Sequence, residues 1–439
     1  MKSFLKKIIP RFIILFYHRC LARLAVFLYR NPSNKLVVIG VTGTNGKSTV
    51  ANFISLILAE AGFKVGLTST YNFRIGQQEW LNNKKMTMLG RLALQRFLAR
   101  LHKAGCQYAV IETSSEGIMQ SRHLGINYDI AVFTNLTPEH IEAHGNFENY
   151  KKAKGKLFKH LTQRKRKKIN GKIIDKISVV NLDDPHADFF ISFPADKKYS
   201  YSLKNKSGDQ EVKTIRAENV SVKKEGSRFH VGGQEFILPM LGEHNIYNAL
   251  AALTVGLSQD ISLVKAKTAL EKVKSLPGRL EFIREGQNFT IIVDYAPEVV
   301  SLNKLYEVVK LFDKNKIIHV LGSCGGGRDK ARRPILGEIA GQKADLVIVT
   351  NEDPYDEDPM AIIDSVAAGA EKTGKIRGQN LFTVLDRREA IKLALQKARA
   401  GDLVLLTGKG AEQAICVAGG KKIPWDERTA VKEILSESA

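Results

Sequence analysis

The sequence predicts an α/β protein: a P-loop central domain with a mostly parallel sheet, followed by a C-terminal Rossmann-like domain. Three observations support this. A glycine-rich turn with Gly-Lys-Ser separates an apolar run from a long apolar-periodic segment over 39–62. Strand-like and helix-like segments then alternate through both halves of the chain, which is typical of parallel sheets. Pro277 and Gly278 interrupt that alternation, and 439 residues are enough for two or three domains of about 150 residues.

The central domain is expected over 36–276. Apolar runs predict strands over 35–43, 64–70, 106–115 and 128–136, and helical periodicity predicts helices over 47–62 and 90–105. Short alternating segments between about 195 and 240 indicate an antiparallel addition. Helical periodicity then returns over 245–259 and 262–276.

The C-terminal domain is expected over 277–439. Strands are predicted over 289–296, 316–323, 344–352 and 402–408, and helices over 301–312 and 333–342. No second Gly-Lys-Ser turn follows Gly278. This half is therefore expected to be Rossmann-like, without a phosphate loop of its own.

Residues 1–35 form a basic amphipathic extension. The longest uncharged apolar run, Phe12 to Tyr17, is far shorter than the roughly 20 residues that a membrane span needs. No small-residue cleavage site of a signal peptide follows it. Two interpretations stay open: amphipathic turns packed on the body of the protein, or a basic helix in peripheral contact with an anionic membrane surface through residues 1–30.

Charge and cysteine content restrict the class of protein. The 67 basic and 45 acidic residues give a net charge of +22, which suits anionic partners. No aromatic-interleaved basic stripe is present, so we expect no nucleic acid. The four cysteines, at 20, 106, 324 and 416, contain no C-x-x-C pair, which argues against a zinc ribbon and fits a reducing cytoplasm.

The turn "GTNGKS" indicates a phosphate-binding loop. Consecutive backbone N–H groups in such a loop point at phosphate oxygens, and the following helix presents its positive end. Lys47 would reach the β- and γ-phosphates, and the Ser48 hydroxyl would contact Mg²⁺. The strict P-loop spacing would place glycine at position 41, where this chain has Val41.

Two further stretches carry polar residues that suit a metal. Glu112 stands at the carboxyl end of a predicted strand, where a hard oxygen ligand could hold Mg²⁺. His140 and His144 are four residues apart, but Gly145 and the lack of a third ligand argue against zinc. Lys154, in a lysine-rich helix, has the pattern of an ordinary solvated residue.

These stretches, with others along the chain, resemble the Mur ligases, which make the peptide of bacterial cell walls. The resemblance is greatest to the MurE type, which adds the third amino acid to UDP-MurNAc-dipeptide. It rests on "GTNGKS", "ETSSEG", "TNLTPEHIEAHG", "YKKAKGKLF", "GEHNIYNALAA", "LPGRLE", "VDYA", "GGGRDKARRP", "TNEDPYDEDP" and "TGKGAE", from about residue 36 to the C-terminus.

The resemblance implies a cytoplasmic, monomeric ligase that uses ATP and Mg²⁺ and passes through an acyl phosphate. It also assigns roles to residues of this sequence. Catalytic roles would fall to Lys47, His140, Lys154 and Arg279. ATP would be held by Gly43, Thr44, Asn45, Gly46, Lys47, Ser48, Thr49, Asn245, Asn248, Arg279 and Asp294. Metal ligands would be Ser48, Glu112, His140 and a carbamylated Lys154. The acceptor would meet Thr87, Ser114 and Ser115, and the incoming amino acid Arg328, Asp353 and Glu412.

The sequence departs from the family pattern in several places: familiar histidines are replaced by Glu116, Pro297 and Ala411, and two further departures bear on the substrates. Only about 40 residues precede the phosphate loop, where the MurE type carries a UDP-binding domain, so a UDP-linked acceptor is in question and a lipid-linked one is an alternative. The familiar D-N-P-R stretch reads "EDPY", and Tyr355 lacks the planar fork with which arginine binds a carboxylate. This disfavours diaminopimelate, and the acidic run around it suits a cationic side chain such as that of lysine, unless the run is an acidic surface loop.

Two other functions remain as alternatives. Folylpolyglutamate synthetases share single motifs and also start close to their phosphate loop. A basic membrane-surface scaffold or a nucleic-acid-associated P-loop ATPase is compatible with the charge.

Overall fold

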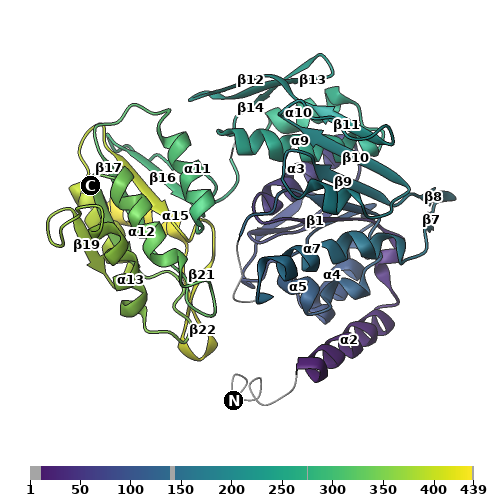
Figure 1. Ribbon diagram of the computed structural model, residues 1–439, viewed down its shortest axis with the longest axis horizontal. Coiled ribbons are helices and arrows are strands. Elements are labelled where there is room, and N and C mark those ends of the chain that lie inside the picture. The colour runs from purple at the N-terminus through teal and green to yellow at the C-terminus, as the bar shows by residue number, and fades with distance from the viewer. Residues whose placement is uncertain (1–10, 139–143, 274, 438–439) are drawn as a thin grey trace.

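The computed structural model describes residues 11–138, 144–273 and 275–437. The chain forms two lobes joined by the segment that contains Pro277 and Gly278, and a separate helix at the N-terminal end (Figure 1). The larger, central lobe contains a nine-stranded sheet, and the smaller, C-terminal lobe contains a six-stranded sheet. The predicted α/β class is therefore confirmed.

Seven strands of the central sheet are parallel. They run in the order β11-β10-β9-β6-β1-β5-β2, and the antiparallel strands β3 and β4 complete the edge beyond β2. All six residues of β1 are buried, so its near-continuous apolar run matches a strand covered on both faces. The strands are β1 Val37–Thr42, β2 Val65–Thr68, β3 Asn72–Ile75, β4 Gln78–Leu81, β5 Tyr108–Glu112, β6 Ile130–Phe133, β9 Ile177–Asn181, β10 Lys197–Ser202 and β11 Val212–Arg216.

Helices cover both faces of this sheet. Ile39 and Val41 of β1 pack with α3 Lys47–Glu60, α9 Glu243–Ser258 and α10 Leu263–Glu271. Val38 faces the other way, toward α4 Arg91–Lys103, α7 Phe147–Thr162 and α8 Ala187–Ile191. Short helical pieces complete this side: η1 Pro32–Lys35, α5 Ser115–Met119 and η2 Arg122–Gly125. The alternation of side chains along β1 thus divides the core into two layers.

The predicted antiparallel addition is only partly correct. β10 and β11 pair in parallel with the main sheet. The antiparallel part is a separate three-stranded sheet of β12 Glu218–Lys223, β13 Gly226–Val231 and β14 Gln234–Leu238. A further hairpin, β7 Lys167–Ile169 and β8 Lys172–Ile174, lies in the basic run after α7.

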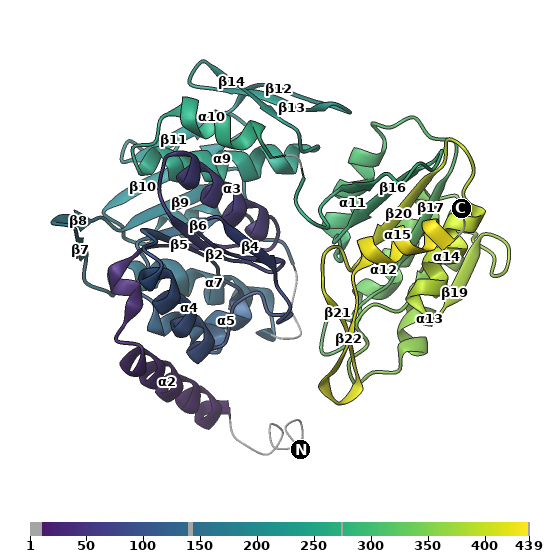
Figure 2. The ribbon, with the colours of Figure 1, turned by 180° about the vertical axis from the view of Figure 1, so that it is seen from behind.

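The C-terminal sheet has the order β15-β16-β20-β17-β18-β19, and only β15 is antiparallel. Its strands are β15 Glu281–Ile283, β16 Thr290–Asp294, β17 Ile317–Leu321, β18 Leu346–Thr350, β19 Leu381–Val384 and β20 Leu403–Thr407. One face packs on α11 Val299–Val309, α12 Arg332–Lys343 and α13 Pro359–Glu371, the other on α14 Arg387–Lys397 and α15 Glu427–Glu437. β21 Ala414–Val417, η3 Ala418–Gly420 and β22 Lys421–Pro424 form a hairpin that extends beyond the sheet (Figure 2).

The N-terminal helix α2, Arg11–Leu28, lies against α4 and η2. It buries the small side chains Ala22 and Ala25 there, whereas Phe16 and Phe27 are 67% and 80% exposed. Of the described helices, α2 included, none combines the length and apolar character needed to cross a bilayer. The described part of the extension therefore contains one 18-residue helix, which is packed on the body and also exposes an apolar face.

Candidate functional site

Two glycines give the phosphate loop its shape. Gly43 has φ 151° and Gly46 has φ 80°, in the region that disfavours residues with a Cβ. A Cβ on Gly43 would lie 1.9 Å from Thr134 Oγ1, and one on Gly46 would lie 2.3 Å from Asn248 Oδ1. Gly46 is also the N-cap of α3, so the loop delivers Lys47 and Ser48 to the positive end of that helix.

The segment after β6 braces this loop. The Asn45 N–H donates to Asn135 Oδ1 at 2.9 Å, and the Thr134 hydroxyl donates to the Asn45 carbonyl at 2.7 Å. The Thr44 N–H donates to the Asn135 carbonyl at 2.8 Å. These bonds fix the loop before any ligand arrives, which is the condition for electrostatic preorganisation.

Glu112 and Ser48 form the polar centre beside the loop. The Ser48 hydroxyl donates to Glu112 Oε2 at 2.7 Å, and Glu112 is 1% exposed. Thr70 donates to the same carboxylate twice, through its N–H at 2.7 Å and its hydroxyl at 2.9 Å. Oxygen ligands next to a phosphate loop fit Mg²⁺. Within the described part of the chain no three His, Cys, Asp or Glu side chains cluster as metal ligands, and His140 lies outside that part.

Lys154 is buried rather than solvated. It is 1% exposed, and its ammonium donates to the Gly43 carbonyl at 2.6 Å and lies 4.4 Å from the centre of the Tyr150 ring. The Tyr150 hydroxyl is 3.1 Å from Thr44 Oγ1. His144 packs on the same ring, with Nε2 3.2 Å from Ser115 Oγ. The loop, Glu112 and Lys154 therefore lie in one region, as the predicted site requires.

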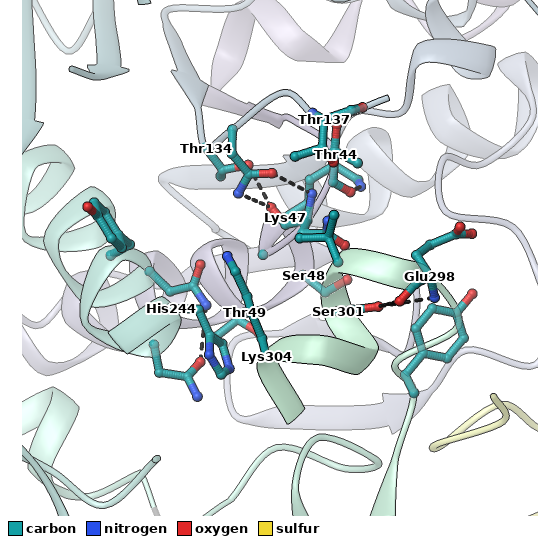
Figure 3. A pocket seen from close by; sticks show the side chains of 18 of the residues that line it. Thr44, Lys47, Ser48, Thr49, Thr134, Thr137, His244, Glu298, Ser301 and Lys304 are labelled. Atoms are coloured by element: carbon teal, nitrogen blue, oxygen red, sulfur yellow. Dashed lines mark hydrogen bonds between the residues drawn. The ribbon is translucent and has the colours of Figure 1, made fainter. Parts of the chain in front are cut away.

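A cavity of about 530 Å³ opens beside the loop and is lined by both lobes. Figure 3 shows Glu298, Ser301 and Lys304 of the C-terminal lobe facing the Lys47–Thr49 segment. Most of the predicted site residues line it: Thr44, Asn45, Gly46, Lys47, Ser48, Thr49, Thr87, Glu112, Asn245, Asn248, Arg279, Asp294 and Arg328. Gly43, Ser114, Ser115, Lys154, Asp353 and Glu412 are outside this lining.

The α9 side of the cavity adds a histidine that motif reading left without a role. His244 is partly buried, and desolvation, with Lys304 and Arg279 nearby, lowers its pKa to about 3. Burial also lowers the pKa of Lys304. Asn248 Nδ2 donates to Asn245 Oδ1 at 3.1 Å, and Asn245 Nδ2 donates to the Leu241 carbonyl at 2.8 Å. The only sequence signal that His244 belongs to the site is its position next to Asn245.

Arg279 and Asp294 reach the cavity from the C-terminal lobe. The Arg279 guanidinium lies 4.6 Å from the centre of the Tyr295 ring. Burial raises the pKa of the Asp294 carboxyl, and Arg279 and two backbone donors oppose that rise. Those donors are the N–H groups of Leu280 at 2.7 Å and Ala296 at 2.8 Å. Both residues are thus held by their own lobe and presented to the other.

The residues expected to meet the acceptor divide into two groups. The Thr87 and Thr70 hydroxyl oxygens are 3.1 Å apart, and Thr70 donates to Glu112, which connects Thr87 to that carboxylate. Ser114 is the N-cap of α5 and accepts from the Gly117 N–H at 3.2 Å. Ser115 is 3% exposed. Thr87 is therefore the best exposed to the cavity of the three.

Most carboxylates of the acidic run already have structural partners. Glu357 pairs with Arg333 at 2.9 Å, and Asp358 caps α13. Asp356 accepts from the Gly419 N–H at 2.8 Å, and Glu352 accepts from Cys324 Sγ at 2.8 Å. Asp353 differs, because it contacts Lys409 and a lysine of the central lobe, Lys85. The acidity of the run is thus mostly structural.

Family models match most of the chain. The model of the Mur ligase middle domain matches residues 41–256, and that of the Mur ligase, glutamate ligase domain matches residues 278–410. The chain is 40% identical over 429 residues to a UDP-N-acetylmuramyl-tripeptide synthetase from Roseiflexus sp. (strain RS-1), which covers 95% of this chain and 82% of that protein. It is 37% identical over 425 residues to UDP-N-acetylmuramoyl-L-alanyl-D-glutamate–2,6-diaminopimelate ligase from Clostridium tetani, covering 95% and 81%.

Solved structures agree in fold. A UDP-N-acetylmuramoyl-L-alanyl-D-glutamate–2,6-diaminopimelate ligase is 31% identical, with a TM-score of 0.58 over 92% of this chain and 79% of the other. Folylpolyglutamate synthase from Mycobacterium tuberculosis has a TM-score of 0.66 over 91% of this chain and 96% of the other, at 17% identity. The second likeness concerns the fold alone.

Proposed function

This chain belongs to the Mur ligase family, and from that premise we propose that it joins an amino acid to the terminal carboxylate of a muramoyl peptide. It is an ATP-dependent carboxylate–amine ligase of peptidoglycan precursor synthesis. The assignment of the site depends on one observation: the Gly43–Ser48 loop, Glu112 and Lys154 lie together. Ser48 Oγ is 2.7 Å from the Glu112 carboxylate, and Lys154 Nζ is 2.6 Å from the Gly43 carbonyl.

The proposed reaction needs two anions to meet. The peptide carboxylate attacks the γ-phosphorus of ATP, the bond to the ADP oxygen breaks, and an acyl phosphate forms. The amine then attacks the acyl carbon, and phosphate leaves with the electrons of the C–O bond. Lys47 and Arg279 are the cations that would offset this charge, and loop N–H groups would hold the phosphates. Mg²⁺ held by Ser48 and Glu112 would supply further positive charge at the β- and γ-phosphates.

The position of Arg279 suggests how water is kept out. Arg279 and Asp294 belong to the C-terminal lobe, whereas Lys47 and Ser48 belong to the central lobe. A complete site therefore needs both lobes together around the substrates. Such closure protects a reactive acyl phosphate from hydrolysis.

We further propose that Lys154 is carbamylated. A carbamate would replace a buried cation by a carboxylate within reach of the phosphate loop, and so give Mg²⁺ another hard ligand. Carbon NMR after exchange with labelled bicarbonate should show a carbamate resonance in the native chain. Its presence in a Lys154→Arg variant at equal intensity would reject the assignment.

The amino acid is proposed to be cationic, with Asp353, Glu412 and Arg328 around it. Tyr355 stands where the family has its carboxylate-binding arginine, has φ 53°, and its ring fills the space against Gly326. The function is tested by mass spectrometry of products formed from ATP, Mg²⁺, UDP-linked or lipid-linked muramoyl dipeptides, and an amino-acid panel. We expect lysine or ornithine to be added. Efficient use of diaminopimelate without lysine would reject the cationic assignment, and glutamate addition to a folate would favour the alternative ligase.

The exposed face of α2 supports peripheral binding to an anionic membrane. Its large apolar side chains recur at helical spacing and are 45–80% exposed: Ile13, Phe16, Tyr17, Leu24, Phe27 and Leu28. Arg19 and Arg23 are exposed along one side of that stripe. An apolar stripe beside arginines complements acyl chains under anionic headgroups. The ligase would then work at the inner face of the cell membrane.

Changing Phe16 and Phe27 to serine is expected to abolish binding to vesicles rich in phosphatidylglycerol, because those rings supply the largest exposed apolar areas of α2. Vesicle flotation measures this. The matched control is Ile173→Ser with Ile376→Ser, which removes exposed apolar side chains elsewhere, at 58% and 53% exposure. Equal flotation of native chain and α2 variant would contradict the proposal.

A further inference from the structure

One lysine of the central lobe is inserted between two carboxylates of the C-terminal lobe. Lys85, in the segment between β4 and α4, places its ammonium 2.6 Å from Asp353 Oδ2 and 2.8 Å from Glu412 Oε2. The Lys85 side chain is 4% exposed. Beside it, Lys422 of β22 donates to the Lys84 carbonyl at 2.9 Å. These contacts join the two lobes through residues that do not line the cavity beside the phosphate loop.

Charge explains why this position holds a cation. Asp353 and Glu412 also share Lys409, whose fully buried ammonium lies 3.0 Å from each carboxylate. The C-terminal lobe alone thus brings two negative charges and one positive charge together. Lys85 supplies the missing positive charge, and a buried carboxylate left without it would be strongly disfavoured.

The two carboxylates contact Lys85 and are not part of the cavity lining. Arg328 and Cys324 line the cavity, whereas Asp353 and Glu412 do not. Lys85 also has φ 51°, a backbone conformation that residues with a Cβ adopt rarely. The contact with the carboxylates therefore holds the segment in a conformation that would relax if the ammonium left.

The segment is connected to the catalytic centre. Two residues after Lys85, the Thr87 hydroxyl is hydrogen-bonded to the Thr70 hydroxyl, and Thr70 donates to Glu112. A movement of Lys85 away from the two carboxylates would therefore shift Thr87 and Glu112, which are proposed to meet the acceptor and Mg²⁺.

We propose that the Lys85 ammonium occupies the subsite that binds the side-chain ammonium group of the incoming amino acid. Without amino acid it neutralises Asp353 and Glu412 and holds the lobes together. An incoming amino acid with a cationic side chain displaces it and takes over the same two carboxylates. Lys85 is thus a specificity-determining residue, because only a ligand that restores the lost positive charge replaces it well. This inference rests on the proposed function for the identity of the ligand, but the interlobe contact is independent of it.

The test compares Lys85→Met with Lys84→Met and Lys85→Arg in the full chain. Lys84 is exposed and only its carbonyl takes part in the contact, so its substitution is the matched control. Hydrogen–deuterium exchange without ligand is expected to rise at residues 82–90 and 409–417 in Lys85→Met only. Titration calorimetry with L-lysine is expected to show about tenfold tighter binding to Lys85→Met, because a competing state has been removed. Norleucine, which lacks the side-chain ammonium group of lysine, should gain nothing.

The measurements distinguish failure of the interlobe contact, of the displacement and of the proposed function. Unchanged exchange in Lys85→Met rejects the interlobe contact, whether or not the chain ligates amino acids. Raised exchange with unchanged or weaker lysine binding rejects the displacement. Absence of ligation with every amino acid in all four proteins would count against the proposed function, while the exchange comparison would still decide the role of Lys85.

Discussion

Replacing Lys47 by alanine is expected to lower ATP-dependent phosphate release by about 10²–10³-fold, the loss typical when one preorganised electrostatic group is removed. Lys47 is the first residue of α3 and lines the cavity. Its ammonium donates to the Thr44 carbonyl at 2.7 Å, so it is already held at the loop, and a bound triphosphate would offer it stronger acceptors. Steady-state phosphate release with Mg²⁺, acceptor and amino acid measures the effect.

The control for this prediction is Lys265→Ala. Lys265 is an exposed lysine on α10, so its loss changes the net charge equally without reaching the cavity. It should retain native turnover. Undiminished turnover in Lys47→Ala would mean that the Gly43–Ser48 loop does not hold the reacting phosphates.

The local sequence pattern was sufficient to predict elements that are buried on both faces. β1 and α3 could be predicted because an apolar run covered on both faces, a glycine-rich turn and a helical period follow one another directly. β10 and β11 could not be placed in this way. β11 is the edge strand and β10 is its neighbour, and both are only partly buried, so the alternation of their sequences looks like that of antiparallel strands. Strand direction is decided by tertiary pairing, which the alternation does not encode.

Lys154 is a proposed site residue whose burial is indicated by the helical period, although the lysine-rich composition of its helix indicates exposure. The helix is rich in lysine, which indicates solvent exposure. Yet Lys154 comes four residues after Tyr150 and three before Leu157, and all three are buried on one face of α7. Its position on the apolar stripe was therefore readable without the resemblance, although its contact with the Gly43 carbonyl was not.

The carboxylate pair of Asp353 and Glu412 could not be recognised from a sequence pattern. Asp353, Glu412 and Lys85 come from three distant segments, and no local pattern connects them. The acidic run suggested a cation site, but three of its members have partners within their own lobe: an arginine, a helix N-terminus and a backbone N–H group. Which carboxylates remain for a ligand depends on packing between lobes and could not be predicted from the sequence.

Replacing Arg387 by methionine is expected to destabilise the C-terminal lobe by about 3–5 kcal/mol, because it leaves a buried carboxylate without its partner. The Arg387 side chain is fully buried and binds Glu427 of α15 through two nitrogens, at 2.6 and 2.8 Å. The same guanidinium donates to the carbonyls of Asn351 at 3.0 Å and Thr407 at 2.7 Å. It thereby ties α15 to the carboxyl ends of β18 and β20, two residues from Asp353.

Urea denaturation followed by tryptophan fluorescence measures this loss. Trp425 Nε1 donates to Glu427 at 2.7 Å, so in a Trp80→Phe background the remaining tryptophan of the chain reports on the lobe that is changed. The matched control is Arg388→Met at the next position. Its ion pairs with Glu433 and Glu437 are largely exposed and should be worth at most about 1 kcal/mol. Equal urea midpoints for the two variants would contradict the claim that burial, rather than the number of ion pairs, makes Arg387 important for the stability of this lobe.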